Sequence, residues 1–179
     1  AAVAMAGMMC VVEPMLSGVG GDTMVLAFSA KERRVFGLNG SGAAPSGATL
    51  ARVGDRPFMP EHGALSVTIP GAVDGWCRLL DRFGTRPLAS LWQPAVNAAR
   101  DGYPVGESIA GVWAVTAQLL PKETPLELMK LILPNGKPPV PGQLVRFPRL
   151  AATLERVGRE GRGGFYAGPR SEEHTSELQ

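Results

Sequence analysis

The sequence predicts an α+β fold, and three observations support that prediction. Apolar residues make up 45% and charged residues 19% of the 179 residues, the balance of an ordinary globular protein. Two short apolar segments, residues 23–29 and 33–38, are separated by the polar stretch "AKER", which is typical of a β-hairpin. From residue 73 onward, apolar residues recur at helical spacing. The expected order is therefore one helix, a hairpin and a mainly helical region, without an internal repeat.

The first segment, residues 1–12, is apolar throughout ("AAVAMAGMMCVV"). It is shorter than the ~20 residues that cross a bilayer, and no basic stretch precedes it as in a signal peptide. Its small residues favour a helix that packs closely against a sheet. The segment begins without Met or a capping residue, so we expect the natural start to be missing. Localisation then stays open between the periplasm or exterior and the cytoplasm.

The region after the hairpin predicts loops and extended backbone. Residues 39–49, "NGSGAAPSGAT", are a loop by composition, rich in Gly, Ser and Ala. Residues 65–72, "LSVTIPGA", predict a strand or an extended segment that Pro70 ends.

The remaining chain predicts five helical segments, at residues 73–83, 94–102, 107–120, within 124–142, and 147–161. Pro94 is expected at the first position of its helix, where its fixed φ and missing N–H suit a helix start. Gly102 is expected to end the same helix. Trp76, Trp92 and Trp113 fall on helical faces and are predicted to lie in the core.

The glycines of "EPMLSGVGGDTMVLAF", residues 13–28, raise the question of a phosphate-binding loop. Such a loop follows a strand and opens a helix, whereas here the helix comes first and the strand follows. We therefore expect a tight helix-to-strand turn in which Gly18, Gly20 and Gly21 adopt positive φ. Glu13 and Asp22 flank this turn, where an acid usually caps or solvates the backbone.

No catalytic or metal-binding set can be assembled from the residues alone. His62 stands alone in "MPEHGA" and is explained as a surface loop residue. Cys10 and Cys77 lack metal-like spacing and are predicted to be buried thiols rather than a disulfide. The net charge of +2, without a dense basic run, does not favour nucleic acid. No motif implies a metal or nucleotide cofactor.

The last ten residues, 170–179, differ abruptly in composition from the preceding chain. "RSEEHTSELQ" has no apolar periodicity and matches the translation of a common sequencing-adapter read. We therefore predict a domain within residues 1–169 and a non-native tail at 170–179.

Three segments of the chain resemble the γ-glutamyltranspeptidase family, also called γ-glutamyltransferases or glutathione hydrolases. They are "AAVAMAGMMCVVEPMLSGVGGD", "VTIPGAVDGWCRLLDRFGTRPLASLWQPAVNAARDGYPV" and "FPRLAATLERVGREGRGGFYAG". They occur in the family's order and cover nearly all of residues 1–169. The resemblance implies an incomplete N-terminal-nucleophile hydrolase αββα sandwich, consisting of the first helix, hairpin and helical region of the large subunit. It also implies that the glycine turn launches a strand and binds no phosphate.

The resemblance also implies a mechanism of acyl transfer. In the family a Thr becomes a new N-terminus after self-cleavage, forms an acyl-enzyme and passes the acyl group to water or an amine. That Thr begins the small subunit, beyond residue 169, so no catalytic residue is expected in this chain. The implied partners are the small subunit of the same precursor and a small-molecule γ-glutamyl or acyl-amide substrate.

One substrate contact of the family should fall within the chain. In the family an Arg before an Ala-Pro pair binds the substrate α-carboxylate, for which the planar guanidinium is suited. The matching positions are Ser41 and, in relatives with "NGSG", Ala43, and neither is charged. "NGSG", "GGD" and "AVDGW" resemble the acylase-like branch, which includes cephalosporin acylases and an oxamate amidohydrolase. The alternatives are a transpeptidase that lost this Arg or uses another one, and a non-catalytic homologue.

Overall fold

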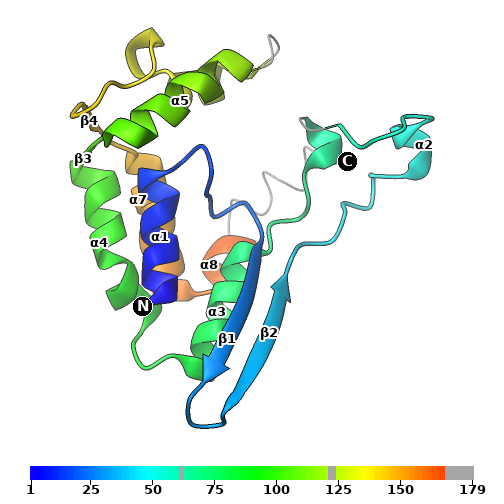
Figure 1. Cartoon of the computed structure of the whole chain (residues 1–179), viewed down its shortest axis with the longest axis vertical. Coiled ribbons are helices and arrows are strands. Elements are labelled where there is room, and N and C mark those ends of the chain that lie inside the picture. Colours follow the sequence, from blue (N-terminus) through cyan, green and yellow to red (C-terminus); the bar gives the residue numbers. More distant parts are fainter. Residues whose placement is uncertain (61–62, 121–123, 168–179) are drawn as a thin grey trace. The chain divides into compact units, whose positions relative to one another are not determined.

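The computed structural model describes residues 1–60, 63–120 and 124–167, and Figure 1 shows the arrangement of its elements. The elements are α1 (Ala2–Val12), β1 (Thr23–Ser29), β2 (Arg34–Gly40), α2 (Leu50–Val53), α3 (Ala72–Phe83), α4 (Leu88–Asp101), β3 (Tyr103–Pro104), α5 (Glu107–Leu119), α6 (Leu126–Ile132), β4 (Leu144–Val145), α7 (Pro148–Glu160) and α8 (Gly163–Tyr166), with short 3₁₀ turns at Ala64–Ser66 and Pro134–Gly136. This mixture of helices and one long hairpin confirms the predicted α+β class.

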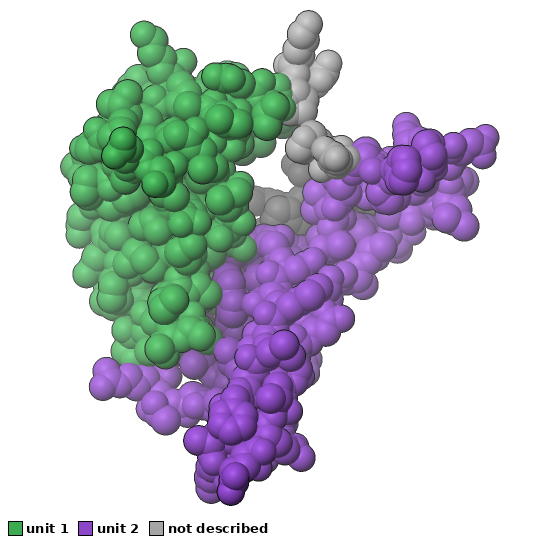
Figure 2. Space-filling view, in the orientation of Figure 1, with its two compact units in different colours: residues 1–18, 89–158 green, residues 19–88, 159–179 purple. Residues whose placement is uncertain are grey.

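The chain divides into two compact units, coloured separately in Figure 2. Unit 1 combines residues 1–18 with 89–158, and unit 2 combines residues 19–88 with 159–179. Within the described ranges, no helix has the length and apolar character needed to cross a membrane. The predicted tail, residues 170–179, and His62 lie outside the described residues.

Unit 1 has a core of helices in which large side chains are fully buried: Trp92, Trp113, Leu154, Val11, Val105 and Val157. The small residues of α1 let it approach α4 closely, since a Cβ on Gly7 would lie 2.4 Å from Nε1 of Trp92. That Nε1 donates a hydrogen bond to the carbonyl of Val3 at 2.9 Å. The close packing predicted for this helix is present, but α4 rather than a sheet is the neighbour that Gly7 meets.

The start of α4 corrects one prediction. The helix begins at Leu88, so Pro94 lies in its interior and not at its first position. An interior proline forfeits a backbone hydrogen bond and costs about 3 kcal/mol. Burial of the apolar face of α4 offsets this cost, because Trp92 and Ala99 are completely buried. Gly102 ends the helix with φ of 104°, as predicted.

Unit 2 is built on the β1–β2 hairpin, whose antiparallel register runs from Thr23 opposite Gly40 to Ser29 opposite Arg34. One face of the hairpin packs on α3, where the rings of Phe36 and Phe83 lie 5.4 Å apart. The opposite face is uncovered: its apolar side chains are between 62% and 84% exposed, namely Met24, Leu26, Phe28 and Val35. The hairpin was predicted from the sequence, although β2 extends two residues beyond the expected end.

Other short elements differ from the predictions. Of the two alternatives for residues 65–72, the strand is wrong: a 3₁₀ turn at Ala64–Ser66 is followed by backbone without regular secondary structure up to α3. The predicted loop at 39–49 is followed by the four-residue helix α2. The strands β3 and β4 have two residues each, which is too short for a periodic pattern in the sequence to predict them.

The predicted core positions are confirmed. Trp76, Trp92 and Trp113 are buried. Cys10 and Cys77 are both buried free thiols. Burial raises the pKa of Cys10 to about 11, against a weaker lowering by a backbone hydrogen bond.

Candidate functional site

The residues matched to the family's substrate loop lie where three backbone segments of unit 2 meet, a place that we call the glycine junction. The glycine junction consists of residues 20–23, 40–43 and 68–72. The carbonyl of Gly21 accepts hydrogen bonds from the amides of Gly71 and Ala72, at 3.0 and 2.9 Å. The amide of Ile69 donates to the carbonyl of Ala43 at 2.9 Å. The start of β1, the end of β2 and the start of α3 are thus tied together.

Glycine is required at this junction because the backbones almost touch. A Cβ on Gly42 would lie 1.5 Å from the carbonyl oxygen of Ile69. A Cβ on Gly71 would lie 2.1 Å from the carbonyl oxygen of Gly40, and one on Gly40 would lie 2.7 Å from that of Thr23. All of these distances are shorter than real Cβ atoms tolerate. The glycines of "NGSG" and "IPGA" therefore permit a close crossing of chains.

The opening glycine turn acts differently from the prediction. The glycines with positive φ lie elsewhere, at residues 54, 63, 102, 136, 142 and 161, and not at Gly18, Gly20 or Gly21. The turn instead presents the carbonyl of Gly21 to the first amides of α3. Gly21 is thus bonded through its backbone carbonyl to the start of α3, and the turn does not depend on left-handed backbone.

Asp22 holds the glycine junction together through its side chain. Its carboxylate accepts a hydrogen bond from the amide of Gly42 at 2.9 Å and from Oγ of Ser41 at 3.1 Å. Oγ1 of Thr68 donates to the same carboxylate, at 3.3 and 3.4 Å from its two oxygens. The hydrogen bond from the Gly42 amide lowers the pKa of Asp22, burial opposes it, and the weaker hydrogen bonds from Ser41 and Thr68 keep the net shift downward. Asp22, which the sequence analysis placed beside the glycine turn, is thus the centre of a hydrogen-bond network.

Ser41 and Ala43, the two residues predicted to contact substrate, both lie at the glycine junction and are exposed. The amide of Ser41 donates to Oδ1 of Asn39 at 3.0 Å, while its hydroxyl is directed to Asp22. The carbonyl of Ala43 is held by the amide of Ile69. The backbone of this loop is therefore fixed on both sides of Gly42.

A second network in unit 2 supports the start of α3. The hydroxyl of Tyr166 donates to the carbonyl of Pro70 at 2.8 Å and accepts from the amide of Asp74 at 3.1 Å. Arg162 bonds the carboxylate of Asp74 through Nε and that of Asp81 through Nη2, the latter at 3.0 Å. The motifs "AVDGW" and "GGFYAG" are thus joined by the hydrogen bond between Asp74 and Tyr166.

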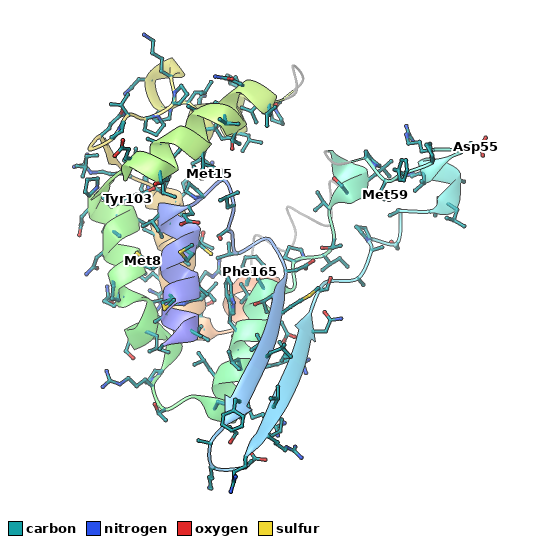
Figure 3. The ribbon with its side chains drawn as sticks, in the orientation of Figure 1. Met8, Met15, Asp55, Met59, Tyr103 and Phe165 are labelled. Carbon is teal, nitrogen blue, oxygen red and sulfur yellow. The ribbon has the colours of Figure 1, made fainter. Side chains whose placement is uncertain are left out.

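The charges of this network stabilise one another. Burial raises the pKa of Asp74, but hydrogen bonds from Arg78 and Arg162 outweigh it and the net pKa is lowered. Tyr166 and the adjacent Phe165, which Figure 3 labels, form an edge-to-face pair on α8, with ring centroids 4.9 Å apart. The sequence analysis did not predict the roles of Tyr166 and Arg162, although the Phe-Tyr-x-Gly motif contains Tyr166 and could have indicated its role.

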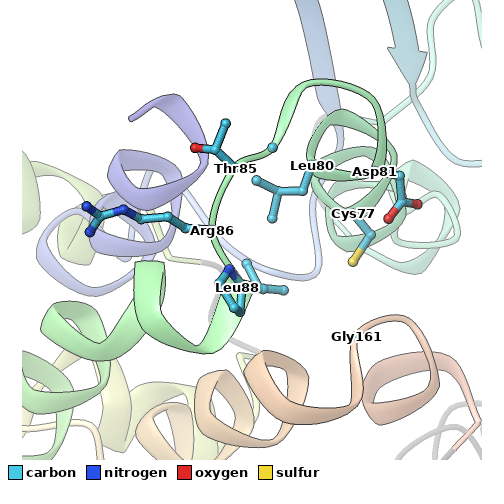
Figure 4. Close-up of a pocket in the computed structure, with 9 residues that line it drawn as sticks. Cys77, Leu80, Asp81, Thr85, Arg86, Leu88 and Gly161 are labelled. Atoms are coloured by element: carbon cyan, nitrogen blue, oxygen red, sulfur yellow. The ribbon is translucent and has the colours of Figure 1, made fainter.

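Unit 2 also contains an open pocket of about 410 Å³, shown in Figure 4. Residues of α3, of the segment after it and of the α7–α8 turn line the pocket: Cys77, Leu80, Asp81, Thr85, Arg86 and Gly161. The pocket includes neither Ser41 nor Ala43. Burial raises the pKa of the Cys77 thiol, which makes it a poor nucleophile at neutral pH. Across residues 1–60, 63–120 and 124–167, no three acidic, Cys or His side chains are grouped as metal ligands.

The fold resembles that of N-terminal-nucleophile hydrolases, and comparison with known proteins gives the family. The profile described as Gamma-glutamyltranspeptidase matches residues 1–179. The chain belongs to the γ-glutamyltranspeptidase family, as the resemblance predicted.

Among curated relatives, the chain is similar to the glutathione hydrolase-like YwrD proenzyme of Bacillus subtilis, with 33% identity over all of this chain and 34% of that protein. It is also similar to the oxamate amidohydrolase proenzyme of Klebsiella pneumoniae, with 34% identity over 96% of this chain and 33% of that protein. The chain thus spans about a third of the length of these relatives.

A solved structure shows the same fold. The cephalosporin acylase of Bacillus halodurans superimposes with a TM-score of 0.88 and 29% identity, over 98% of this chain and 34% of that one. This similarity confirms the predicted fold class and its partial nature.

Proposed function

We propose that the protein cleaves amides, or transfers their acyl group, through an N-terminal Thr that lies outside residues 1–179. The observation that carries the proposal is the family match along the chain, together with relatives named as hydrolase, amidohydrolase and acylase. The nucleophile would arise by self-cleavage, since two of these relatives are named proenzymes. The α-amine of such a Thr can act as its own base.

The partner in this proposal is the small subunit from the same precursor. It would cover the bare face of the hairpin, where Met24, Leu26 and Phe28 of β1 expose most of their surface. A contiguous apolar sheet face of this kind marks a surface that another layer covers. The sandwich predicted from the family needs a second sheet at this position.

The glycine junction is proposed as the donor-binding loop, with Ser41 and Ala43 facing the acyl donor. Neither residue offers the guanidinium that suits a donor carboxylate. This favours an acylase-like or amidohydrolase-like specificity over the γ-glutamyl or glutathione-type specificity. The reason is the size of the missing interaction: a charge-assisted hydrogen bond contributes about 1.5–3 kcal/mol.

The test uses the complete protein encoded by the natural gene. We expect electrophoresis to show two chains from one precursor, and N-terminal sequencing of the shorter chain to give Thr. The purified protein should release p-nitroaniline from at least one acyl p-nitroanilide. Replacing that Thr with Ala should abolish both cleavage and turnover, whereas Asp55→Asn, a change at an exposed acid outside the glycine junction, should affect neither. An intact precursor that hydrolyses no amide would refute the proposal.

A further inference from the structure

We propose that Asp22 makes the donor-binding loop anionic, so that the enzyme favours acyl donors whose distal end is neutral or cationic and disfavours those with a carboxylate there. This inference rests on the proposed role of residues 41–43 as the donor-binding loop. It adds the chemical class of the donor and a residue, Asp22, that selects it.

The first step of the argument is that Asp22 keeps its charge. The hydrogen-bond donors around it are the Gly42 amide and the hydroxyls of Ser41 and Thr68, all of which are neutral. These neutral donors hold the pKa of Asp22 below its ordinary value, so the carboxylate is ionised at neutral pH. Hydrogen bonds from neutral groups stabilise the negative charge without cancelling it.

The second step is that four arginines of unit 2 have partners other than Asp22. Three described arginines of the unit are held by other groups: Arg34 by Glu32, Arg78 by Asp74, and Arg162 by Asp74 and Asp81. Arg56 donates to backbone carbonyls of α2. None of these contacts reaches Asp22.

The third step is that the charge lies directly behind the surface that a donor would meet. Oδ2 of Asp22 is 3.1 Å from Oγ of Ser41, and Oδ1 is 2.9 Å from the Gly42 amide. A charged donor group in contact with Ser41 is then closer to Asp22 than the Debye length, which is ~8 Å at physiological ionic strength. Salt therefore screens the interaction of the two charges only in part. A carboxylate there meets a like charge, whereas an ammonium group meets an opposite one.

The Ser41 hydroxyl does not compensate for this charge. Because it donates its proton to Asp22, it presents its oxygen lone pairs to a ligand. A ligand ammonium or amide N–H can donate to that oxygen, and a carboxylate cannot. Hydrogen bonding and charge therefore select the same class of donor.

The change Asp22→Asn separates charge from shape. The Asn side chain has the same size, its Oδ1 can still accept from the Gly42 amide, and its Nδ2 can donate to the oxygen of Ser41 or Thr68. The matched control is Asp55→Asn, which removes a negative charge from an exposed acid of the same unit, located beside α2 in Figure 3.

The experiment measures kcat/KM of the complete protein for three p-nitroanilides. The 4-aminobutyryl donor carries an ammonium group, the glutaryl donor a carboxylate, and the γ-glutamyl donor both. We expect the wild type to prefer the 4-aminobutyryl donor over the glutaryl donor. Asp22→Asn should raise the ratio of glutaryl to 4-aminobutyryl kcat/KM about tenfold, a change of ~1.4 kcal/mol, and Asp55→Asn should leave this ratio unchanged.

Two further measurements keep the inference falsifiable if a variant folds poorly or turnover is absent. Raising the salt from about 0.05 to about 0.5 M should shrink the wild-type preference, because exposed charges are screened. Without turnover, the dissociation constants of 4-aminobutyrate and glutarate should show the same preference. A preference that does not respond to salt, or the binding of neither ligand, overturns the inference.

The outcomes also distinguish the inference from the proposed function. If Ala43→Arg shifts the donor ratio and Asp22→Asn does not, residues 41–43 contact the donor and only the role of Asp22 is wrong. If neither substitution shifts the ratio in an active enzyme, residues 41–43 are not the donor-binding loop and the role of Asp22 fails with that assignment, whereas the amide-cleaving function stands.

Discussion

The steric requirement at Gly42 can be tested by the change Gly42→Ala in the complete protein. The new Cβ would lie 1.5 Å from the carbonyl oxygen of Ile69, and ordinary contact begins at 3.4 Å. The two backbones must therefore separate by about 1.9 Å, the difference between these distances. Gly42 lies outside the left-handed region, so the effect comes from crowding and not from backbone conformation.

This separation breaks the hydrogen bonds that hold the glycine junction. The Gly42 amide lies 2.9 Å from Asp22, and the Ile69 amide lies 2.9 Å from the carbonyl of Ala43. A bond to a charged group contributes about 1.5–3 kcal/mol and a neutral one about 0.5–1.5 kcal/mol. Because Asp22 is exposed, the lower ends apply, and we expect a loss of about 2 kcal/mol.

The assay combines the melting temperature with hydrogen exchange of peptides that cover residues 40–43 and 68–72. Both peptides should exchange faster in Gly42→Ala, and the melting temperature should fall by several degrees. Gly37→Ala is the control, because its Cβ meets nothing closer than 3.8 Å and alanine is favoured over glycine within a strand. Unchanged exchange and melting in Gly42→Ala would refute the close-crossing argument.

Three further predictions concern hydroxyl and thiol groups. Tyr166→Phe should destabilise the start of α3 by about 1 kcal/mol, seen as faster exchange at residues 70–75, because its hydroxyl bonds both Pro70 and Asp74. Tyr103→Phe should leave the melting temperature unchanged or raise it, since that buried hydroxyl has no hydrogen-bond partner among the described residues. An equal fall in melting temperature for Tyr166→Phe and Tyr103→Phe would contradict the argument. Cys10, whose pKa burial raises to about 11, should resist thiol reagents at about pH 8 until the protein unfolds, and rapid labelling of the native protein would show that the thiol is accessible.

Several parts of the fold could be predicted from the sequence because their signals are local. The helix over residues 2–12, the β1–β2 hairpin and the amphipathic α3 each follow from spacing and turn composition within a few residues. The start of α4 could not be predicted in this way. Local preference placed Pro94 at a helix start, and the burial of Trp92 and its neighbours decided otherwise.

The candidate site also has features that the sequence predicts and features that only the tertiary structure shows. The sequence by itself determined the family, through three motifs in order, and it determined that positions 41 and 43 carry no charge. It also marked the glycines as unusual, but it attributed them to turns.

Only the tertiary structure decided what Asp22 and these glycines do. Asp22 accepts from Ser41, 19 residues away, and from Thr68, 46 residues away. Gly42 is required by the carbonyl of Ile69 and Gly71 by that of Gly40. A local pattern reports only on neighbours within a few positions along a helix or strand. Hydrogen bonds and close approaches between distant segments depend on where the fold brings those segments together. The local periodicity of the sequence does not predict these long-range contacts.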